Sequence, residues 1–292
     1  MTVTMKLLKD SQGIIKHNLY FLKGASIMNN TIYPLLTGFF TVAFKGDLKF
    51  PKVENIPSFI FLIITESGEP VLVDTGFDLN HIPAPDSCGK REPHQEIPAL
   101  LEQFALTPYD IKKVVQTHLH WDHAAGLKYF PHADIYIQAS EFEGLFHLMK
   151  YEETSFCPDH WFHLRDRFIL VDGDMEIMPG ITLIRTGGHT AGHQALKIQC
   201  RDKTVVLLGD SPFTYEWLWT LVPENLWEIY KTGRGKNFFW QEGMLPEIKS
   251  WYEKAEIIHG REHDDYSVED IKRMGEIHIF SHDPSLLNIK SI

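Results

Sequence analysis

The sequence predicts a single α/β domain over residues 1–292, and three features of the chain support this fold class. Short apolar runs of strand length recur, and those at 59–64 and 204–208 are apolar enough for buried strands. Between such runs, apolar residues repeat at helical spacing in 97–104. No low-complexity stretch or long linker divides the chain, so we expect the strands and helices to share one domain.

Composition and charge argue against several classes of function. The chain has 28 basic and 39 acidic residues and a net charge of −11, which disfavours a nucleic-acid partner because phosphate binding depends on clustered Lys and Arg. Its three cysteines do not suggest a disulfide framework and fit a reducing compartment. No apolar run reaches the length of a signal-peptide core or a membrane span, so we expect a cytoplasmic protein with no membrane partner.

The first part of the chain is rich in strand-like runs. We expect strands at 19–22, 39–44 and 59–64, where apolar and aromatic residues concentrate. The stretch 24–38 is expected to be a loop packed on the core. A hydrophobic rim of a substrate pocket and a dimer contact are the alternatives for this stretch, so a homodimer stays open.

Later elements follow from similar local signals. Residues 80–94 are broken by Pro and Gly and are expected to form a loop. Ser140 is expected to be the N-cap of a helix, with Glu143 three residues later completing a capping box. Further strands are expected at 71–73, 134–138, 168–171, 182–184 and 204–208.

The densest cluster of metal-ligating residue types comprises His118, His120, Asp122 and His123. A short Val-Val run leads into it and indicates the end of a buried strand. In an extended segment, side chains two residues apart share a side, so His118 and His120 can converge on one point. Asp122 and His123 follow at the turn into an expected helix and can face a second, adjacent point. The chain has 16 histidines, but four ligand types in this order are hard to obtain by chance, and they suit zinc and similar ions.

Two later stretches carry further candidate ligands. Gly187 and Gly188 allow backbone angles that are closed to other residues, so the turn can aim His189 inward. Alone, His189 would more often be an ordinary buried histidine, and its place after the first cluster is what favours a ligand. The apolar strand at 204–208 is followed by Asp210, whose two carboxylate oxygens can each bind one ion.

These motifs resemble those of a known superfamily. His-x-His-x-Asp-His at 118–123 and the stretch from Thr186 to Gln194 are similar to the two signature motifs of the metallo-β-lactamase fold superfamily. Gly-His-Gln at 192–194 is most similar to its quorum-quenching branch, the N-acyl homoserine lactonases. The resemblance runs from about Phe59 to the C-terminus. It implies an αββα sandwich, in which two mixed β-sheets pack face to face with helices outside and the site lies at one edge between the sheets.

The resemblance also implies two divalent metal ions per chain. Zinc is expected, with iron, manganese or cobalt as alternatives. The implied ligands are His118, His120 and His189 for one ion, and Asp122, His123 and His282 for the other, with Asp210 bridging the two.

Two further residues are expected to support the ligands. Asp74, in an Asp-Thr-Gly turn, matches a carboxylate that lies beneath the metal site in the superfamily, although a plain Asp-initiated turn is an equal alternative. His193 is expected to be a supporting or structural histidine. His160 and His163 are expected to be surface or cap histidines, because the ligand set is complete without them.

The last ligand has two candidates. The family ends with an apolar strand, a small residue and His-Asp, and the segment from Ile277 to Pro284 matches this pattern and favours His282. His263, in a looser match at 261–264, is the alternative.

The resemblance implies a tyrosine three residues after the bridging Asp in lactonases, where it polarises the substrate carbonyl. That position here is Phe213, which has no hydroxyl to donate, and Tyr215 lies two residues further on. Either Tyr215 substitutes through a shifted loop, or the enzyme works without it. Because Asp210 stands where the zinc β-lactamases have Cys, antibiotic hydrolysis is disfavoured.

By this resemblance the chain is expected to hydrolyse a lactone, such as an N-acyl homoserine lactone, or a related ester by attack of a metal-bridging hydroxide. Asp122 would carry a proton to the leaving alkoxide, and Tyr215 would polarise the carbonyl. A glyoxalase II-like thioesterase and a mono-iron persulfide dioxygenase are the alternative enzymes. A binding-only protein that keeps the ligands for stability is the remaining alternative. The expected partner is a small-molecule lactone or ester.

Overall fold

The computed structural model describes residues 29–42, 53–82, 88–148, 155–187, 189–210 and 268–292, which contain two mixed β-sheets. In spatial order, the first sheet comprises β4 (Cys88–Lys90), β1 (Thr31–Val42), β2 (Val53–Ile64), β3 (Pro70–Val73), β5 (Lys113–Val115), β6 (Asp134–Gln138) and β7 (Phe168–Val171). The second sheet comprises β12 (Ile277–Ile279), β11 (Lys203–Leu207), β10 (Gln194–Cys200), β9 (Ile181–Arg185) and β8 (Met175–Met178).

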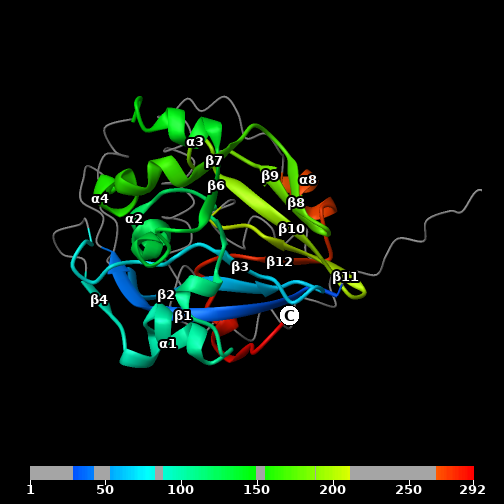
Figure 1. Cartoon of the computed structure of the whole chain (residues 1–292), viewed down its shortest axis with the longest axis horizontal. Helices are drawn as coiled ribbons and strands as arrows, with labels where there is room; N and C mark the ends of the chain where they lie inside the picture. Colours follow the sequence, from blue (N-terminus) through cyan, green and yellow to red (C-terminus); the bar gives the residue numbers. More distant parts are fainter. Residues whose placement is uncertain (1–28, 43–52, 83–87, 149–154, 188, 211–267) are drawn as a thin grey trace, which may run out of the picture.

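The helices of these residues are short. The α-helices are α1 (Ile97–Glu102), α2 (Trp121–Ala124), α3 (Ala139–Gly144), α4 (Pro158–Trp161) and α8 (Val268–Arg273). The 3-10 helices are η1 (Pro93–Gln95), η2 (Pro108–Asp110), η3 (Ala125–Tyr129), η4 (Phe162–Arg167) and η6 (Pro284–Asn288). Figure 1 shows α1, α2 and α4 beside the first sheet and α8 beside the second. None of the helices in the described ranges combines the length and apolarity that crossing a bilayer requires.

Strand β2 shows how the two core layers arise from one apolar run. Phe59, Phe61 and Ile63 join a buried cluster with residues of the second sheet. Ile60 and Leu62 point to the other face and join a cluster with residues of α1 and α4, because side chains alternate along a strand. All five side chains are at most 3% exposed, and burying each stabilises the fold by about 1.5–3 kcal/mol. The run is apolar throughout because both faces of the strand are buried.

The outer face of the second sheet is covered by α8. His278 of β12 points away from the layer between the sheets, and its Nε2–H donates to the carbonyl oxygen of Ile271 at 2.9 Å. Ile271 is itself buried. Helices therefore flank both sheets, which confirms the predicted αββα sandwich.

Strand β1 corrects the prediction of a loop at 24–38. Residues Thr31–Val42 pair with β2 along most of their length, and only Phe39 to Thr41 also pair with β4. Pro34 is tolerated because it lies where β1 has one neighbouring strand among those described. Gly38, with a φ of 130°, lies at a shift in the pairing register. The pocket rim and the dimer contact at this stretch both stay predictions, and the strand expected at 19–22 lies outside the described residues.

The strand predicted at 59–64 begins earlier than expected, since β2 starts at Val53, and the later predicted strands are confirmed to within a residue at their ends. The capping prediction at Ser140 is wrong, because β6 runs directly into α3 and the N-cap is Gln138 in extended conformation. Ser140 therefore lies inside the helix. The loop expected at 80–94 contains the short strand β4 and the 3-10 turn η1.

Candidate metal centre

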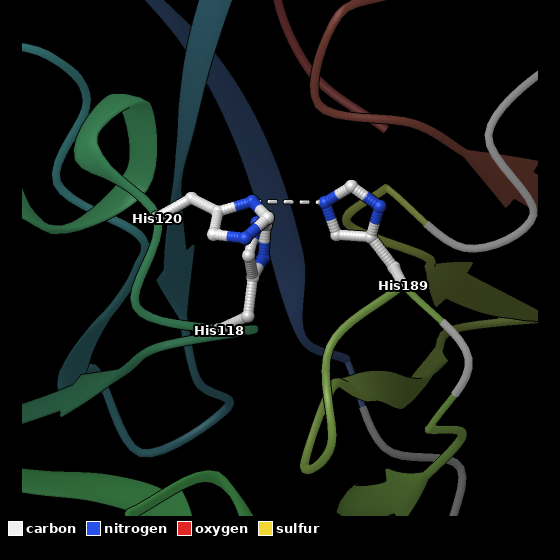
Figure 2. A group of neighbouring side chains, drawn as sticks. All are labelled: His118, His120 and His189. Atoms are coloured by element: carbon white, nitrogen blue, oxygen red, sulfur yellow. Dashed lines mark hydrogen bonds between the residues drawn. The ribbon is translucent and has the colours of Figure 1, made fainter. Parts of the chain in front are cut away.

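His118, His120 and His189 form the first of two groups of potential metal ligands, and their ligand atoms lie within 4.8 Å of one another. His118 and His120 follow β5, and the centroids of their rings are 4.5 Å apart. His189 approaches from the turn between β9 and β10, with its ring centroid 4.7 Å from each of the others. Figure 2 shows the three rings converging, with His189 Nε2 at 3.1 Å from His120 Nδ1.

The second group comprises Asp122, His123, Asp210 and His282. Helix α2 begins at Trp121, so Asp122 and His123 lie in its first turn. His123 Nε2 is 3.3 Å from His282 Nε2 and 3.8 Å from Asp122 Oδ2. His282, which follows β12, also lies 3.4 Å from Asp122 Oδ2. Three separate parts of the chain thus contribute to this group.

Asp210 faces both groups at once. Its Oδ2 lies 3.4 Å from His123 Nε2 and 3.5 Å from His189 Nε2. Its Oδ1 lies 3.4 Å from His282 Nε2. The turn that presents Asp210 depends on Gly209, because the φ at this position is 56° and a Cβ would lie 2.6 Å from His193 Nε2. One carboxylate therefore lies between two clusters of imidazole nitrogens.

The spacing of these atoms fits metal ions. Four ligands placed tetrahedrally about 2.0–2.1 Å from an ion of the size of zinc lie about 3.3–3.4 Å from one another. The donor atoms given above are 3.1–3.8 Å apart. In addition, His118 Nε2 is buried and has no hydrogen-bond partner among the described residues, which suits a nitrogen that coordinates an ion. Both groups therefore have the donors and the spacing that a divalent ion needs.

The electrostatics of the second group centre on Asp210. Burial alone would raise the pKa of Asp210, but the side chains of His282 and His123 hold it well below its usual value. In return, burial opposes protonation of His282, yet Asp210 and Asp122 raise the pKa of His282 to about 10. The same balance, with Asp210 and Asp74 as the anions, raises the pKa of His123 well above its usual value. Asp210 is therefore held in its anionic form.

The first group has the opposite character. Burial, followed by the neighbouring His123 and His120, holds the pKa of His118 well below its usual value. Burial also lowers the pKa of His189, although Asp210 opposes the shift. These imidazoles are therefore neutral at pH 7, and neutral imidazole is the form that binds metal.

Asp74 lies beneath the second group. Its Oδ2 lies 2.8 Å from His123 Nδ1, and its Oδ1 accepts the backbone N–H of Thr117 at 2.8 Å. Donation from Nδ1–H to a carboxylate fixes the tautomer of His123 and leaves Nε2 facing the site. Asp74 is buried and has a φ of 58°, which is uncommon for a residue other than glycine. Its contacts are those of a residue that orients a ligand.

His193 supports the backbone of Asp210. Its Nε2 accepts the backbone N–H of Asp210 at 3.2 Å, so Nδ1 carries the proton and donates to the hydroxyl of Thr186 at 2.6 Å. The carbonyl oxygen of His193 also accepts the backbone N–H groups of Thr186 and Gly187, both at 2.9 Å. His193 thereby links the turn that carries His189 to the turn that carries Asp210.

The other candidate residues fall in three places. Tyr215, Phe213 and His263 lie outside the described residues, whereas His282 lies in the second group. His163 is exposed, as predicted. His160 is only 6% exposed, so it is not the surface histidine of the prediction, and its alternative role as a cap histidine stays a prediction. Helix α4, which carries His160, packs against η3, and the ring of His160 contacts that of His81 edge-on.

Sequence reasoning missed Glu141. This buried residue accepts hydrogen bonds from both motif loops, at Leu119 and at Thr190 and Gly192. Its partners lie 22 to 51 residues away in the sequence, so no local sequence pattern predicts these contacts. The one available signal is an acidic residue three positions after the end of β6, a strand that pairs with the strand leading into the metal motif.

Comparison with known proteins agrees with this geometry. The family described as the Metallo-beta-lactamase superfamily matches residues 54–271. An N-acyl homoserine lactonase of Bacillus thuringiensis is 31% identical over 183 residues, which cover 56% of this chain and 68% of the relative. A probable metallo-hydrolase of Mycobacterium tuberculosis is 28% identical over 175 residues, covering 52% of this chain and 56% of the relative.

Solved structures show the same fold. A variant of the AiiA protein of B. thuringiensis with N-decanoyl-L-homoserine bound at its active site has a TM-score of 0.55 at 24% identity, covering 87% of this chain and 93% of that one. A quorum-quenching N-acyl homoserine lactone hydrolase has a TM-score of 0.56 at 23% identity, covering 91% and 96% of the two chains.

The chain belongs to the metallo-β-lactamase superfamily. It is a metal-dependent hydrolase, and its His and Asp groups, together with the fold, imply divalent metal ions. The predicted resemblance to the superfamily and to its N-acyl homoserine lactonases is confirmed.

Proposed function

We propose that this hydrolase opens lactones or closely related carboxylic esters, with N-acyl homoserine lactones as the favoured substrate class. The observation that carries the proposal is Asp210, whose carboxylate lies between the two groups, with His189 of the first group 3.5 Å away and His123 and His282 of the second group each 3.4 Å away. A carboxylate in this position can hold two ions side by side, and paired ions serve hydrolysis at neutral pH. The relatives named N-acyl homoserine lactonases support the choice of substrate.

Two divalent ions, with zinc expected, would occupy the two groups. A pair of such ions supplies a water of pKa about 7 and stabilises the negative charge that forms on an attacked carbonyl oxygen. The proposed ligands are His118, His120 and His189 for one ion, and Asp122, His123 and His282 for the other, with Asp210 shared between them.

Asp122 is proposed to move a proton to the leaving oxygen. Opening a lactone leaves an alkoxide that must be protonated, and a carboxyl at the edge of the site can do this. The side chain of Asp122 is 12% exposed, whereas that of His123 is fully buried, so Asp122 is the more accessible of the two. Tyr215, proposed to polarise the carbonyl, stays a prediction.

The remaining residues keep this arrangement fixed. Asp74 holds His123 through Nδ1, and His193 holds the backbone of Asp210. On the second group, the Nδ1–H of His282 donates to the carbonyl oxygen of Pro57 at 2.9 Å, and its ring packs edge-on against Phe40. Ligands oriented in this way need little reorganisation during the reaction.

The proposal is tested with a substrate panel on the metal-replete protein. N-acyl homoserine lactones of increasing acyl length are compared with S-lactoylglutathione. We expect lactone hydrolysis with a kcat/KM of about 10⁴–10⁸ M⁻¹s⁻¹, lost on chelation and restored by added zinc. Turnover of S-lactoylglutathione alone would instead identify a thioesterase. One iron per chain with oxidation of a persulfide would identify a dioxygenase, and a metal-loaded protein inert to every substrate would identify a binding protein.

A further inference from the structure

Glu141 is a buried carboxylate between the two motif loops. Its side chain lies in the first turn of α3, directly after β6, and the residue is 2% exposed. A carboxylate buried this deeply requires hydrogen-bond donors. Its Oε1 accepts the backbone N–H of Leu119 at 2.9 Å. Its Oε2 accepts the hydroxyl of Thr190 at 2.6 Å and the backbone N–H of Gly192 at 2.9 Å.

These donors stand next to the three histidines of the first group. Leu119 lies between His118 and His120 in the sequence, and Thr190 directly follows His189. One oxygen of Glu141 therefore fixes the backbone that carries two of the ligands. The other oxygen fixes the backbone that carries the third. The carboxylate therefore connects the two loops whose separation determines the distances between the three imidazoles.

The contact between α3 and the second loop is built for a short, fixed distance. A Cβ at Gly192 would lie 2.0 Å from the backbone nitrogen of Glu141 and 2.5 Å from its Cα. A Cβ at Gly144 would lie 2.9 Å from the Cβ of Ala191. Any larger side chain at these positions would push the loop away from the helix. The glycines allow the close approach that brings Thr190 and Gly192 to the carboxylate.

We propose that Glu141 is a positioning residue that sets the spacing of His118, His120 and His189 and thereby the affinity of the first group for its ion. The proposal rests on the proposed function in one respect, namely that these three histidines hold an ion. The second group has supports of its own, since Asp74 orients His123. The effect of Glu141 is therefore confined to one of the two ions.

The test is a cobalt titration of the metal-free protein, followed by visible absorption, with Glu141→Gln and its matched control Glu143→Gln. Glutamine keeps the size of the side chain but replaces one acceptor oxygen with an NH₂ group, so one of the two loops loses its partner. Glu143 lies on the same helix, is exposed and undergoes the same change. His282→Ala, which removes a ligand of the second group, identifies which equivalent belongs to which group.

Glu141→Gln is expected to weaken one of two cobalt equivalents by about 10–100-fold and to leave the equivalent that His282→Ala removes unchanged. Glu143→Gln is expected to bind both like the native protein. Native affinities in Glu141→Gln would overturn the proposal. Equal weakening of both equivalents, with a lower melting temperature of the metal-free protein, would also overturn it by showing a general role in folding.

Thr190→Val is the second variant, for the case in which Glu141→Gln does not fold. It keeps the carboxylate and removes one hydrogen bond, so a smaller weakening of the same equivalent is expected, and no weakening would contradict the proposal. A native protein that binds fewer than two equivalents would overturn the proposed function as well. A native protein that binds two equivalents but opens no lactone would contradict only the proposed substrate, and the titration would still decide the role of Glu141.

Discussion

The two ligand groups differ in charge and in how the chain holds them. The first contains three imidazoles, whereas the second pairs two imidazoles with two carboxylates. Burial keeps His118 of the first group neutral by lowering its pKa. In the second group, Asp210 overcomes burial and raises the pKa of His282 to about 10. The groups are neighbours, yet only the second has opposite charges within it.

This difference has a structural consequence. Opposite charges in a buried site attract one another, so the second group is partly held together by its own side chains. Neutral imidazoles attract one another only weakly, so the geometry of the first group depends on the surrounding chain. Glu141, which accepts donors from both loops, supplies that support. A residue outside the two motifs thus contributes most to the geometry of the group whose ligands do not attract each other.

The largest effect is expected at the residue that the two groups share. Asp210→Asn should lower lactone hydrolysis by about 10³-fold or more and release metal, because an amide is a weak ligand and carries no charge. Steady-state kinetics with metal analysis measures both. Asp202→Asn, at an exposed turn, makes the same change away from the site and should leave both near native. Full activity in Asp210→Asn would show that the groups do not need a shared carboxylate.

Removal of the metal ions should affect the two groups to different extents. Each ion should stabilise the fold by about 4 kcal/mol when free metal exceeds its Kd 1,000-fold, so chelation should lower the melting temperature markedly. Hydrogen exchange of the metal-free protein should speed up more at residues 189–192 than at 281–283, because the first group has no internal ion pair. Equal changes in the two segments would contradict a difference in how the two groups are held together.

The histidines of the motif were predictable because their signal is local. His118 and His120 alternate within one short segment, and Asp122 and His123 follow in the same turn. The strands were equally accessible, since a run such as 59–64 reports burial on both faces. Signals of this kind lie within a few residues of each other and need no knowledge of the fold.

The features that sequence missed depend on distant contacts. Glu141 acts through partners 22 to 51 residues away, so its own helix gives no sign of its burial. Pro34 and Gly38 interrupt the strand pattern, yet β1 forms because β2 pairs with it along most of its length. His160 lies in a four-residue helix that is too short to show a periodic face, so its burial could not be foreseen.

Asp74→Asn should weaken the second group more than the first. The amide can still accept from Thr117, but its NH₂ group opposes the Nδ1–H of His123. We expect metal affinity to fall by about 10–100-fold and the free energy of unfolding by about 1–3 kcal/mol. Isothermal titration and chemical denaturation measure these. Asp78→Asn, at an ion pair with the half-exposed Lys128, is the control and should change stability by less than about 1 kcal/mol. Equal losses of metal affinity and stability in both variants would show that Asp74 has no particular role in orienting His123.

The smallest effect concerns His160, a buried histidine outside both groups. Burial, with His81 nearby, lowers its pKa to about 4, below the value of about 6.5 in an unfolded chain. Between pH about 4 and 6.5, the unfolded state therefore binds a proton at this site and the folded state does not. The stability from this site is complete above pH about 6.5 and falls as the pH drops towards 4, by about 2 kcal/mol.

Replacing His160 should remove this acid sensitivity. His160→Gln should flatten the dependence of the unfolding free energy on pH between about 4 and 6.5, whereas the exposed His163→Gln should not. Denaturant unfolding of the metal-replete proteins across this window measures the difference. Parallel pH curves for both variants would show that the acid sensitivity arises from other groups, such as the neutral histidines of the first group.

The most direct measurement is the metal content of the native protein and of two single-ligand variants, by mass spectrometry after desalting. His189→Ala removes a ligand from the first group, and His282→Ala removes one from the second. Two ion sites sharing Asp210 predict two divalent ions per chain in the native protein and one in each variant. A native protein that carries a single ion, lost in both variants alike, would contradict the assignment of two sites.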